Sequence, residues 1–186
     1  MLLVICGPSG VGKSTLCNGL MAKYPRIGLS VSHTTRAPRG EEVDGVHYHF
    51  TDKATFRQMI TDDAFAEHAE VFGRYYGTAR STIDDLLAAE RDILFDIDYQ
   101  GAKQLKSAYP DAVTVLIAPP SIEILKSRLA NRATDSPEQI ETRLAKAKLE
   151  LSQYPTFSYL VVNDDLERAS SLLSAIYRSE ASRVGR

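Results

Sequence analysis

A glycine-rich turn between an apolar run and a helical pattern restricts the fold of this chain more than any other feature. Residues 7–14 read G-P-S-G-V-G-K-S and directly follow the apolar run 2–6. Behind the turn, Leu16 and Leu20 recur at helical spacing. A strand, a glycine loop and a helix in this order form a P-loop, in which successive backbone N–H groups surround a phosphate. The motif therefore predicts a nucleoside triphosphate site at the end of the first strand.

The residue types within the motif match the chemistry of a triphosphate. Glycines let the backbone N–H groups turn inward, and the following helix adds its positive N-terminal end. Lys13 can reach the β- and γ-phosphates, and the Ser14 hydroxyl can ligate Mg²⁺. We assign ATP binding to Gly7, Pro8, Ser9, Gly10, Val11, Gly12, Lys13, Ser14 and Thr15.

Three more apolar runs, at residues 93–97, 113–118 and 159–162, resemble the first. They are nearly continuous rather than alternating, which is typical of strands covered on both faces of a parallel sheet. Helical patterns separate them, including one over 122–129 that Ser121 can cap. The alternation predicts an α/β fold with a parallel sheet.

Two segments interrupt this alternation. Residues 31–80 are more polar and aromatic, with a predicted short strand at 47–50. Residues 132–138 form a break between two predicted helices. We interpret the first as a small mixed α/β insertion and the second as part of a helical lid. The predicted division is a core of 1–32, 80–127 and 154–186, an insertion of 33–79 and a lid of 128–153.

Composition excludes several classes of function. The 186 residues carry a net charge of −2, which gives no general attraction to nucleic acid or to an anionic membrane. No apolar stretch approaches the ~20 residues that span a bilayer. Cys6 and Cys17 lie in apolar or helical patterns and suggest buried thiols in a reducing compartment. We expect a cytoplasmic protein, and the oligomeric state stays open.

The P-loop alone leaves several enzyme classes open. Residues 98–101 match the D-x-x-G pattern of GTP switches. However, Gly19, Arg132 and Asp164 follow the asparagines, so the N-K-x-D element that reads guanine in those proteins is missing. We interpret the D-x-x-G match as coincidental.

Arginines away from the glycine loop indicate a second phosphate-bearing ligand. Arg36 and Arg39 stand three apart in a proline-marked segment, Arg128 and Arg132 four apart on a predicted helix, and Arg143 on the next helix. Arginine forks match phosphate oxygens in two-point contacts. Beside a P-loop, these sites suggest that two phosphorylated molecules meet.

The chain resembles the guanylate kinase family over nearly its whole length. The order and spacing of its matching segments are specific. These segments are GPSGVGKST (7–15), SVSHTTRAPRGEEVDGVHYHF (30–50), FAEHAEVFGRYYGT (65–78), ILFDIDYQG (93–101), IAPPSIEILKSRLANR (117–132) and VVNDD (161–165). The resemblance implies transfer of the γ-phosphoryl group of ATP to GMP, and also to dGMP, in purine nucleotide metabolism.

The resemblance also assigns the acceptor site. It implies that guanine is recognised by Ser32, Glu67, Thr78 and Asp98. It also implies that the acceptor phosphate is bound by Arg36, Arg39, Tyr48 and Tyr76, and that Glu42 supports these residues. Carboxylates accept hydrogen bonds and so suit the N1–H and N2–H₂ donors of guanine.

On the donor side, the resemblance places Asn163 near the adenine of ATP and assigns the transferring phosphoryl group to the lid arginines Arg128, Arg132 and Arg143. Asp96 ends a predicted buried strand, where it either supports Mg²⁺ through water or caps a loop. The lid departs from the family pattern at Ala133, where a glycine is usual.

A non-catalytic guanylate-kinase-like binding domain and a kinase of a phosphorylated sugar are the alternative functions.

Overall fold

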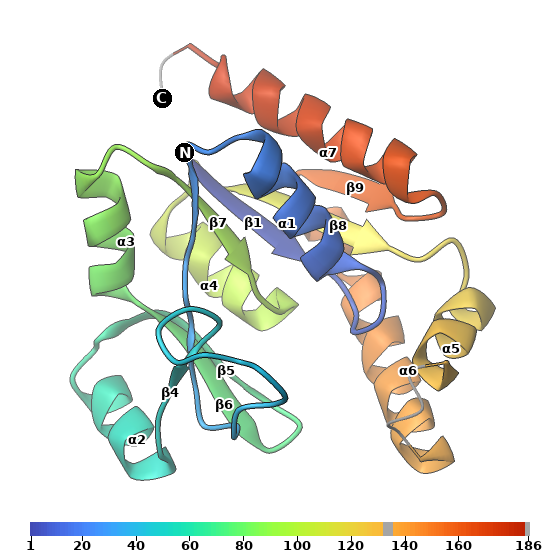
Figure 1. Ribbon diagram of the computed structural model, residues 1–186, viewed down its shortest axis with the longest axis horizontal. Helices are drawn as coiled ribbons and strands as arrows, with labels where there is room; N and C mark the ends of the chain where they lie inside the picture. The colour runs from blue at the N-terminus through green and yellow to red at the C-terminus, as the bar shows by residue number, and fades with distance from the viewer. Residues whose placement is uncertain (132–135, 185–186) are drawn as a thin grey trace.

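A parallel sheet of five strands lies at the centre of the computed structural model, which describes residues 1–131 and 136–184 (Figure 1). Its strand order is β2-β7-β1-β8-β9, and every neighbouring pair is parallel. The strands are β1 Leu2–Cys6, β2 Ile27–Leu29, β7 Asp92–Asp96, β8 Val113–Ala118 and β9 Tyr159–Val162. The predicted α/β fold with a parallel sheet is confirmed, and β2 is a strand that the sequence patterns missed.

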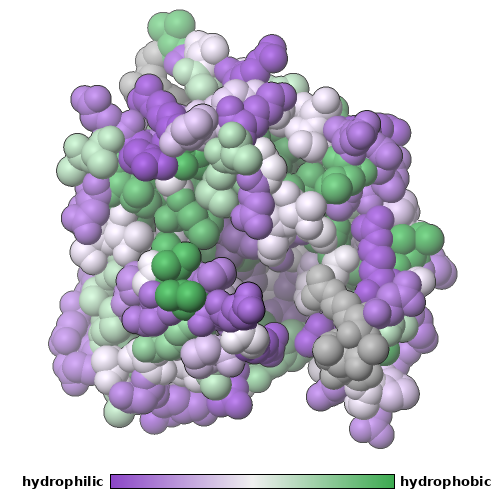
Figure 2. All heavy atoms as spheres, viewed as in Figure 1, coloured by the Kyte–Doolittle hydropathy of each residue, from purple (hydrophilic) through white to green (hydrophobic). Residues whose placement is uncertain are grey.

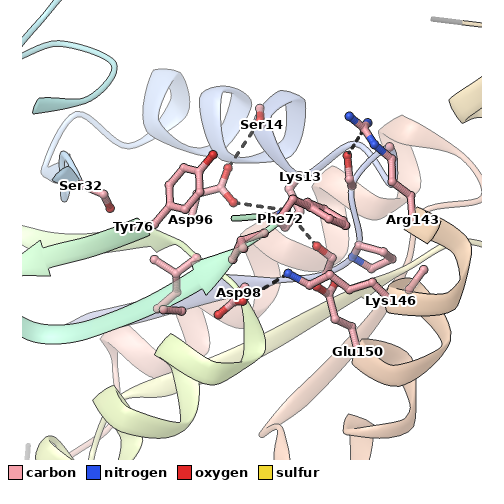
Figure 3. Close-up of a pocket in the computed structure, with 18 of the residues that line it drawn as sticks. Lys13, Ser14, Ser32, Phe72, Tyr76, Asp96, Asp98, Arg143, Lys146 and Glu150 are labelled. Carbon is pink, nitrogen blue, oxygen red and sulfur yellow. Dashed lines mark hydrogen bonds and ion pairs between the residues drawn. The ribbon is translucent and has the colours of Figure 1, made fainter. Parts of the chain in front are cut away.

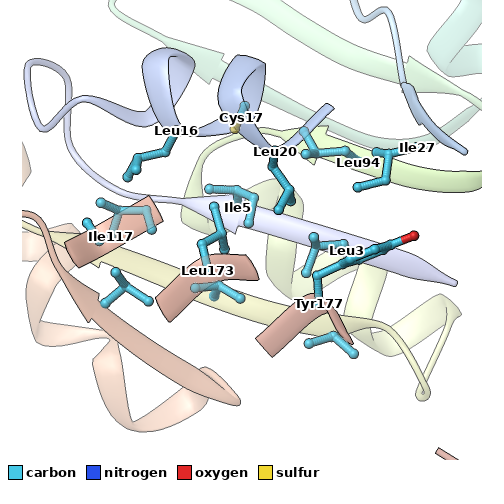
Figure 4. Close-up of a cluster of buried hydrophobic side chains, with 14 of the residues drawn as sticks. Leu3, Ile5, Leu16, Cys17, Leu20, Ile27, Leu94, Ile117, Leu173 and Tyr177 are labelled. Carbon is cyan, nitrogen blue, oxygen red and sulfur yellow. The ribbon is translucent and has the colours of Figure 1, made fainter. Parts of the chain in front are cut away.

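Helices cover both faces of this sheet. Helices α1 (Lys13–Lys23) and α7 (Leu166–Ala181) pack on one face through a buried cluster that includes Leu3 and Leu173 (Figure 4). Helices α3 (Arg80–Ala88) and α4 (Tyr99–Ala108) contribute to the cluster on the other face, with Phe95. Burial on both faces explains why the central strands are continuously apolar.

A second, smaller sheet has the strand order β4-β3-β6-β5. Its elements are β3 His33–Thr34, β4 His49–Phe50, β5 Phe65–Val71 and β6 Arg74–Ala79, with helix α2 Lys53–Thr61 beside them. Gly73, at a φ of +73°, turns the chain between β5 and β6. The expected strand at 47–50 is shorter than predicted, because strand pairing begins at His49. Antiparallel pairing of β5 with β6 sets Glu67 opposite Thr78.

Two helices near the predicted lid lie across from the small sheet (Figure 1). Helix α5 (Ile122–Ala130) begins after Ser121, whose Oγ accepts the Ile124 N–H at 3.2 Å, as predicted. Helix α6 (Pro137–Ser152) packs on α5 and leads into the short 3₁₀ helix η1 (Tyr154–Thr156). Of the predicted break at 132–138, residues 132–135 lie outside the described residues. Across the described chain, each helix is too short or too polar to traverse a bilayer.

Candidate active site

A cavity of about 310 Å³ opens between the small sheet and helix α6 (Figures 2 and 3). The glycine loop after β1 and Asp96 at the end of β7 form its base. In open parallel sheets, ligands bind beyond the carboxyl ends of the strands. The lining includes Ser9, Gly12, Lys13, Ser14, Ser32, Tyr48, Glu67, Phe72, Tyr76, Asp96, Asp98, Arg143, Lys146 and Glu150.

The glycine loop takes a backbone course that side chains would obstruct. A Cβ on Gly7 would lie 2.3 Å from the Ile117 carbonyl oxygen, and one on Gly12 would lie 2.5 Å from Nδ2 of Asn163. Gly12 is the N-cap of α1, so the N-terminal end of this helix faces the cavity beside Lys13. A glycine loop that leads into the positive end of a helix is a binding site for a phosphate, which agrees with the predicted ATP site.

Lys13 and Ser14 both meet Asp96 at the base of the cavity. The Lys13 ammonium donates to the Gly7 carbonyl at 2.9 Å and lies 3.5 Å from Oδ1 of Asp96. The Ser14 hydroxyl donates to Oδ2 of the same carboxylate at 3.4 Å. A hydroxyl and a carboxylate oxygen are the hard donors that Mg²⁺ prefers, and this ion keeps several waters as ligands. Within residues 1–131 and 136–184, no three His, Cys, Asp or Glu side chains gather as a metal cluster.

Glu67, Thr78 and Ser32 form a buried polar chain on the small-sheet side. The Thr78 hydroxyl donates to Oε1 of Glu67 at 2.7 Å and lies 3.3 Å from the Ser32 hydroxyl. Glu67 and Ser32 line the cavity, whereas Thr78 lies behind them. Burial raises the pKa of Glu67 to about 7, against the opposing hydrogen bond from Thr78. The carboxylate therefore changes charge near neutral pH.

Asp98 caps helix α4 at the edge of the same cavity. Its Oδ1 accepts the N–H groups of Gln100 at 3.0 Å and Gly101 at 3.1 Å. Its Oδ2 accepts from the Gln100 side chain at 3.1 Å and from Lys146 at 3.5 Å. The carboxylate is held in place from two sides, by its own helix and by α6.

The residues predicted to bind the acceptor phosphate lie around the ion pair between Arg36 and Glu42. Both terminal nitrogens of Arg36 contact the Glu42 carboxylate, at 2.8 and 2.9 Å, and Oε2 of Glu42 also accepts the Arg39 backbone N–H at 2.8 Å. Hydrogen bonding to Arg36 lowers the pKa of Glu42. The guanidinium lies 5.1 Å from the centre of the Tyr48 ring, which meets Tyr76 edge-on at 6.1 Å. Arg36 is therefore fixed by Glu42, and the two tyrosines line the cavity in front of it.

The residues assigned to the donor side occupy different positions around the glycine loop. Arg143 lines the cavity and donates to the Ser9 hydroxyl at 3.4 Å. Arg128 instead donates to the backbone carbonyls of Asn163 at 3.0 Å and Val11 at 3.5 Å. The Asn163 amide is buried and donates to the Val11 carbonyl at 2.7 Å, so it supports the loop from behind. Arg132 lies outside the described residues.

The lining residues that sequence reasoning missed include Lys146, Glu150 and Phe72. The Lys146 ammonium lies 3.6 Å from Glu150 and 5.1 Å from the centre of the Phe72 ring. Burial raises the pKa of Glu150, while Lys146 opposes that shift. Helical spacing could have indicated two of them, because Lys146 and Glu150 follow Arg143 at intervals of three and seven on one helix face. Nothing in the local sequence points to Phe72.

The fold and this cavity, with the glycine loop at its base, define a P-loop phosphotransferase. A family model described as guanylate kinase matches residues 1–180. A guanylate kinase of Alkalilimnicola ehrlichii is 45% identical over 100% of this chain and 91% of its own, and one of Thiobacillus denitrificans is 48% identical over 96% and 86%. The crystal structure of guanylate kinase from Anaplasma phagocytophilum aligns with a TM-score of 0.82 and 34% identity, covering 99% of this chain and 87% of that one. The chain belongs to the guanylate kinase family of ATP:GMP phosphotransferases.

Proposed function

We propose that the chain transfers the γ-phosphoryl group of ATP to GMP, and to dGMP, giving ADP and the guanosine diphosphate, in cytoplasmic purine nucleotide metabolism. One observation carries the acceptor assignment: two carboxylates, Glu67 and Asp98, line the same cavity as the glycine loop. The buried, unpaired state of Cys6 and Cys17 fits a reducing compartment.

Guanine suits the acceptor side because its donors match these acceptors. N1–H and N2–H₂ are adjacent donors, and ionised Glu67 and Asp98 only accept. The Ser32 hydroxyl can donate to O6, and Thr78 orients Glu67 through its hydrogen bond. Adenine would present its N1 lone pair to a carboxylate. Each buried polar group left unpaired costs about 1–3 kcal/mol, so two mismatches predict selectivity of roughly a hundredfold or more.

The acceptor phosphate would lie against the clamp of Arg36, Arg39, Tyr48 and Tyr76. Glu42 holds the Arg36 fork in one orientation, which lowers the ordering cost when a phosphate arrives. Arg39 is exposed, and its backbone N–H donates to the same Glu42 carboxylate. We assign these side chains to binding and placing the acceptor.

Phosphoryl transfer in this cavity needs charge compensation rather than a general base. The attacking group is a phosphate oxygen of GMP, largely dianionic at neutral pH because its second pKa is ~6. Lys13 and Arg143, which both line the cavity, offset the repulsion between the two anions and align them. Ser14 and Asp96 would hold Mg²⁺, which neutralises charge on the β- and γ-phosphates when bound. We keep Arg128 and Arg132 as candidates that act on the same charge when the lid moves.

A coupled assay with Mg-ATP and GMP, dGMP, AMP or ribose phosphates tests the proposal. We expect rapid ADP formation with GMP, slower formation with dGMP and almost none with AMP. ADP formation with AMP but not GMP would overturn the acceptor assignment, and turnover of ribose phosphates alone would indicate a sugar-phosphate kinase. GMP binding without any turnover would indicate a non-catalytic binding domain.

A further inference from the structure

Gly101, in the first turn of helix α4, touches both carboxylates assigned to guanine. Its backbone N–H donates to Oδ1 of Asp98 at 3.1 Å. On the same residue, a Cβ would lie 2.3 Å from Oε2 and 3.0 Å from the carboxyl carbon of Glu67. Non-bonded heavy atoms do not approach a Cβ that closely. The Glu67 carboxylate therefore occupies the space that any other side chain at position 101 would fill.

Neighbouring contacts prevent α4 from moving away from Glu67. The Gln104 side chain, one turn further along α4, accepts the His68 N–H at 3.1 Å and donates to the His68 carbonyl at 2.8 Å. This pair of bonds fixes α4 to strand β5 beside Glu67. The Ile97 side chain would lie 3.2 Å from the same Cβ, so it leaves a side chain at position 101 no room to turn away from Glu67 on that side. A methyl group at position 101 would therefore displace the Glu67 carboxylate and its hydrogen bond from Thr78.

We propose that Gly101 is a positioning residue for acceptor specificity: it sets where the Glu67 carboxylate stands relative to Asp98. The inference rests on the proposed function, in which these two carboxylates accept the guanine donors. It also replaces the interpretation of residues 98–101 as a coincidental D-x-x-G match. The aspartate caps the helix, and the glycine three positions later leaves room for the partner carboxylate.

The test compares Gly101→Ala with Gly19→Ala, a matched control. Gly19 is also helical but, unlike Gly101, is exposed, and a Cβ on it would meet no atom within 4 Å. For Gly101→Ala we expect the KM for GMP to rise at least about tenfold, and the KM for ATP to stay within about twofold. Gly19→Ala should leave both KM values unchanged. A KM for GMP within twofold of wild type in Gly101→Ala would overturn the inference.

A double-mutant cycle with Glu67→Asp separates positioning from general damage. The shorter aspartate withdraws its carboxylate from position 101, so adding Gly101→Ala to Glu67→Asp should change the KM for GMP by less than about twofold. If the two effects multiply instead, the role of Gly101 is merely structural. Should Gly101→Ala fail to fold, the double variant decides: recovery of folded protein supports the inference, and continued failure overturns it.

The same cycle distinguishes this inference from the proposed function. Glu67→Asp alone should raise the KM for GMP. If it does not, Glu67 does not read the acceptor, and both the guanine assignment and the inference about Gly101 fail. If Glu67→Asp raises the KM while Gly101→Ala leaves it unchanged, the guanine assignment stands and the inference about Gly101 alone is wrong.

Discussion

The Lys146 ammonium lies 3.5 Å from Oδ2 of Asp98, joining helix α6 to the start of helix α4 across 48 residues of sequence. The same ammonium contacts Glu150 on its own helix and faces the Phe72 ring at the β5–β6 turn. One cation thus contacts three sides of the cavity (Figure 3). In this arrangement it links α6, which lies in the predicted lid, to Asp98, which is predicted to bind the acceptor.

Replacing Lys146 by Met should destabilise the ligand-free protein. Glu150 is buried and would lose its partner cation, and Asp98 would lose one of its four hydrogen-bond donors. Because the ammonium is partly exposed, we expect a loss of about 1–2 kcal/mol in the free energy of unfolding. Chemical denaturation measures this loss. Lys148→Met, an exposed site on the same helix, is the control, and equal losses in both variants would contradict the assignment.

Patterns along the chain predict the sheet better than they predict the cavity. Strands β1, β7 and β8 are apolar runs because helices cover both of their faces. The same expectation is wrong for β9, an edge strand that buries Val161 but exposes Leu160 and Val162. Strand β2 escaped prediction because Ile27–Leu29 is too short to form a distinct apolar run. The side chains assigned to the acceptor lie within sequence motifs of the family, so the resemblance could identify them. The Asp98–Lys146 contact depends on how α6 stands over α4, which local sequence does not encode.

Lys13→Ala should abolish most turnover without unfolding the protein. Its ammonium contacts the Gly7 carbonyl of the glycine loop and Asp96. Losing a preorganised positive group at the transferring phosphoryl lowers kcat by roughly a hundredfold or more. Steady-state kinetics and circular dichroism check the two halves of the prediction. Lys23→Ala, at the far end of the same helix, is the matched control. Full activity in Lys13→Ala would contradict the assigned role.

Glu42→Gln should weaken GMP binding through Arg36. The substitution keeps the shape of the side chain but removes the charge that orients the guanidinium by two short contacts. Hydrogen bonds to charged groups contribute about 1.5–3 kcal/mol, so we expect a rise of about tenfold or more in the KM for GMP, with a smaller change in the KM for ATP. The neighbouring exposed residue supplies the control, Glu41→Gln. An equal rise for both substrates would point to general disruption instead.

The stability of the ligand-free protein should fall as pH rises towards neutrality because of Glu67. Burial raises the pKa of this carboxyl in the folded state to about 7, above its ordinary value of 4.5. Between these values the folded protein holds a proton that the unfolded chain has released, so the free energy of unfolding decreases with pH. The contribution is fully present below the unfolded pKa and is lost by pH 7–8, up to about 3 kcal/mol. Denaturation at pH 5 and pH 8 should show a smaller pH dependence for Glu67→Gln, and parallel curves would refute the prediction.

GMP binding should show the opposite pH dependence, because guanine donors need the ionised form of Glu67. With a pKa of about 7, roughly one-tenth of the carboxylate is ionised at pH 6, so wild-type affinity for GMP should be about tenfold weaker there than at pH 8. The second pKa of the GMP phosphate, ~6, affects wild type and variant alike. The ratio of the GMP affinities of wild type and Glu67→Gln therefore reports the ionisation of Glu67 alone. Calorimetric titration of both proteins across this range should show a ratio that changes in favour of wild type as pH rises, and a constant ratio would mean that the ionised carboxylate does not contact the base.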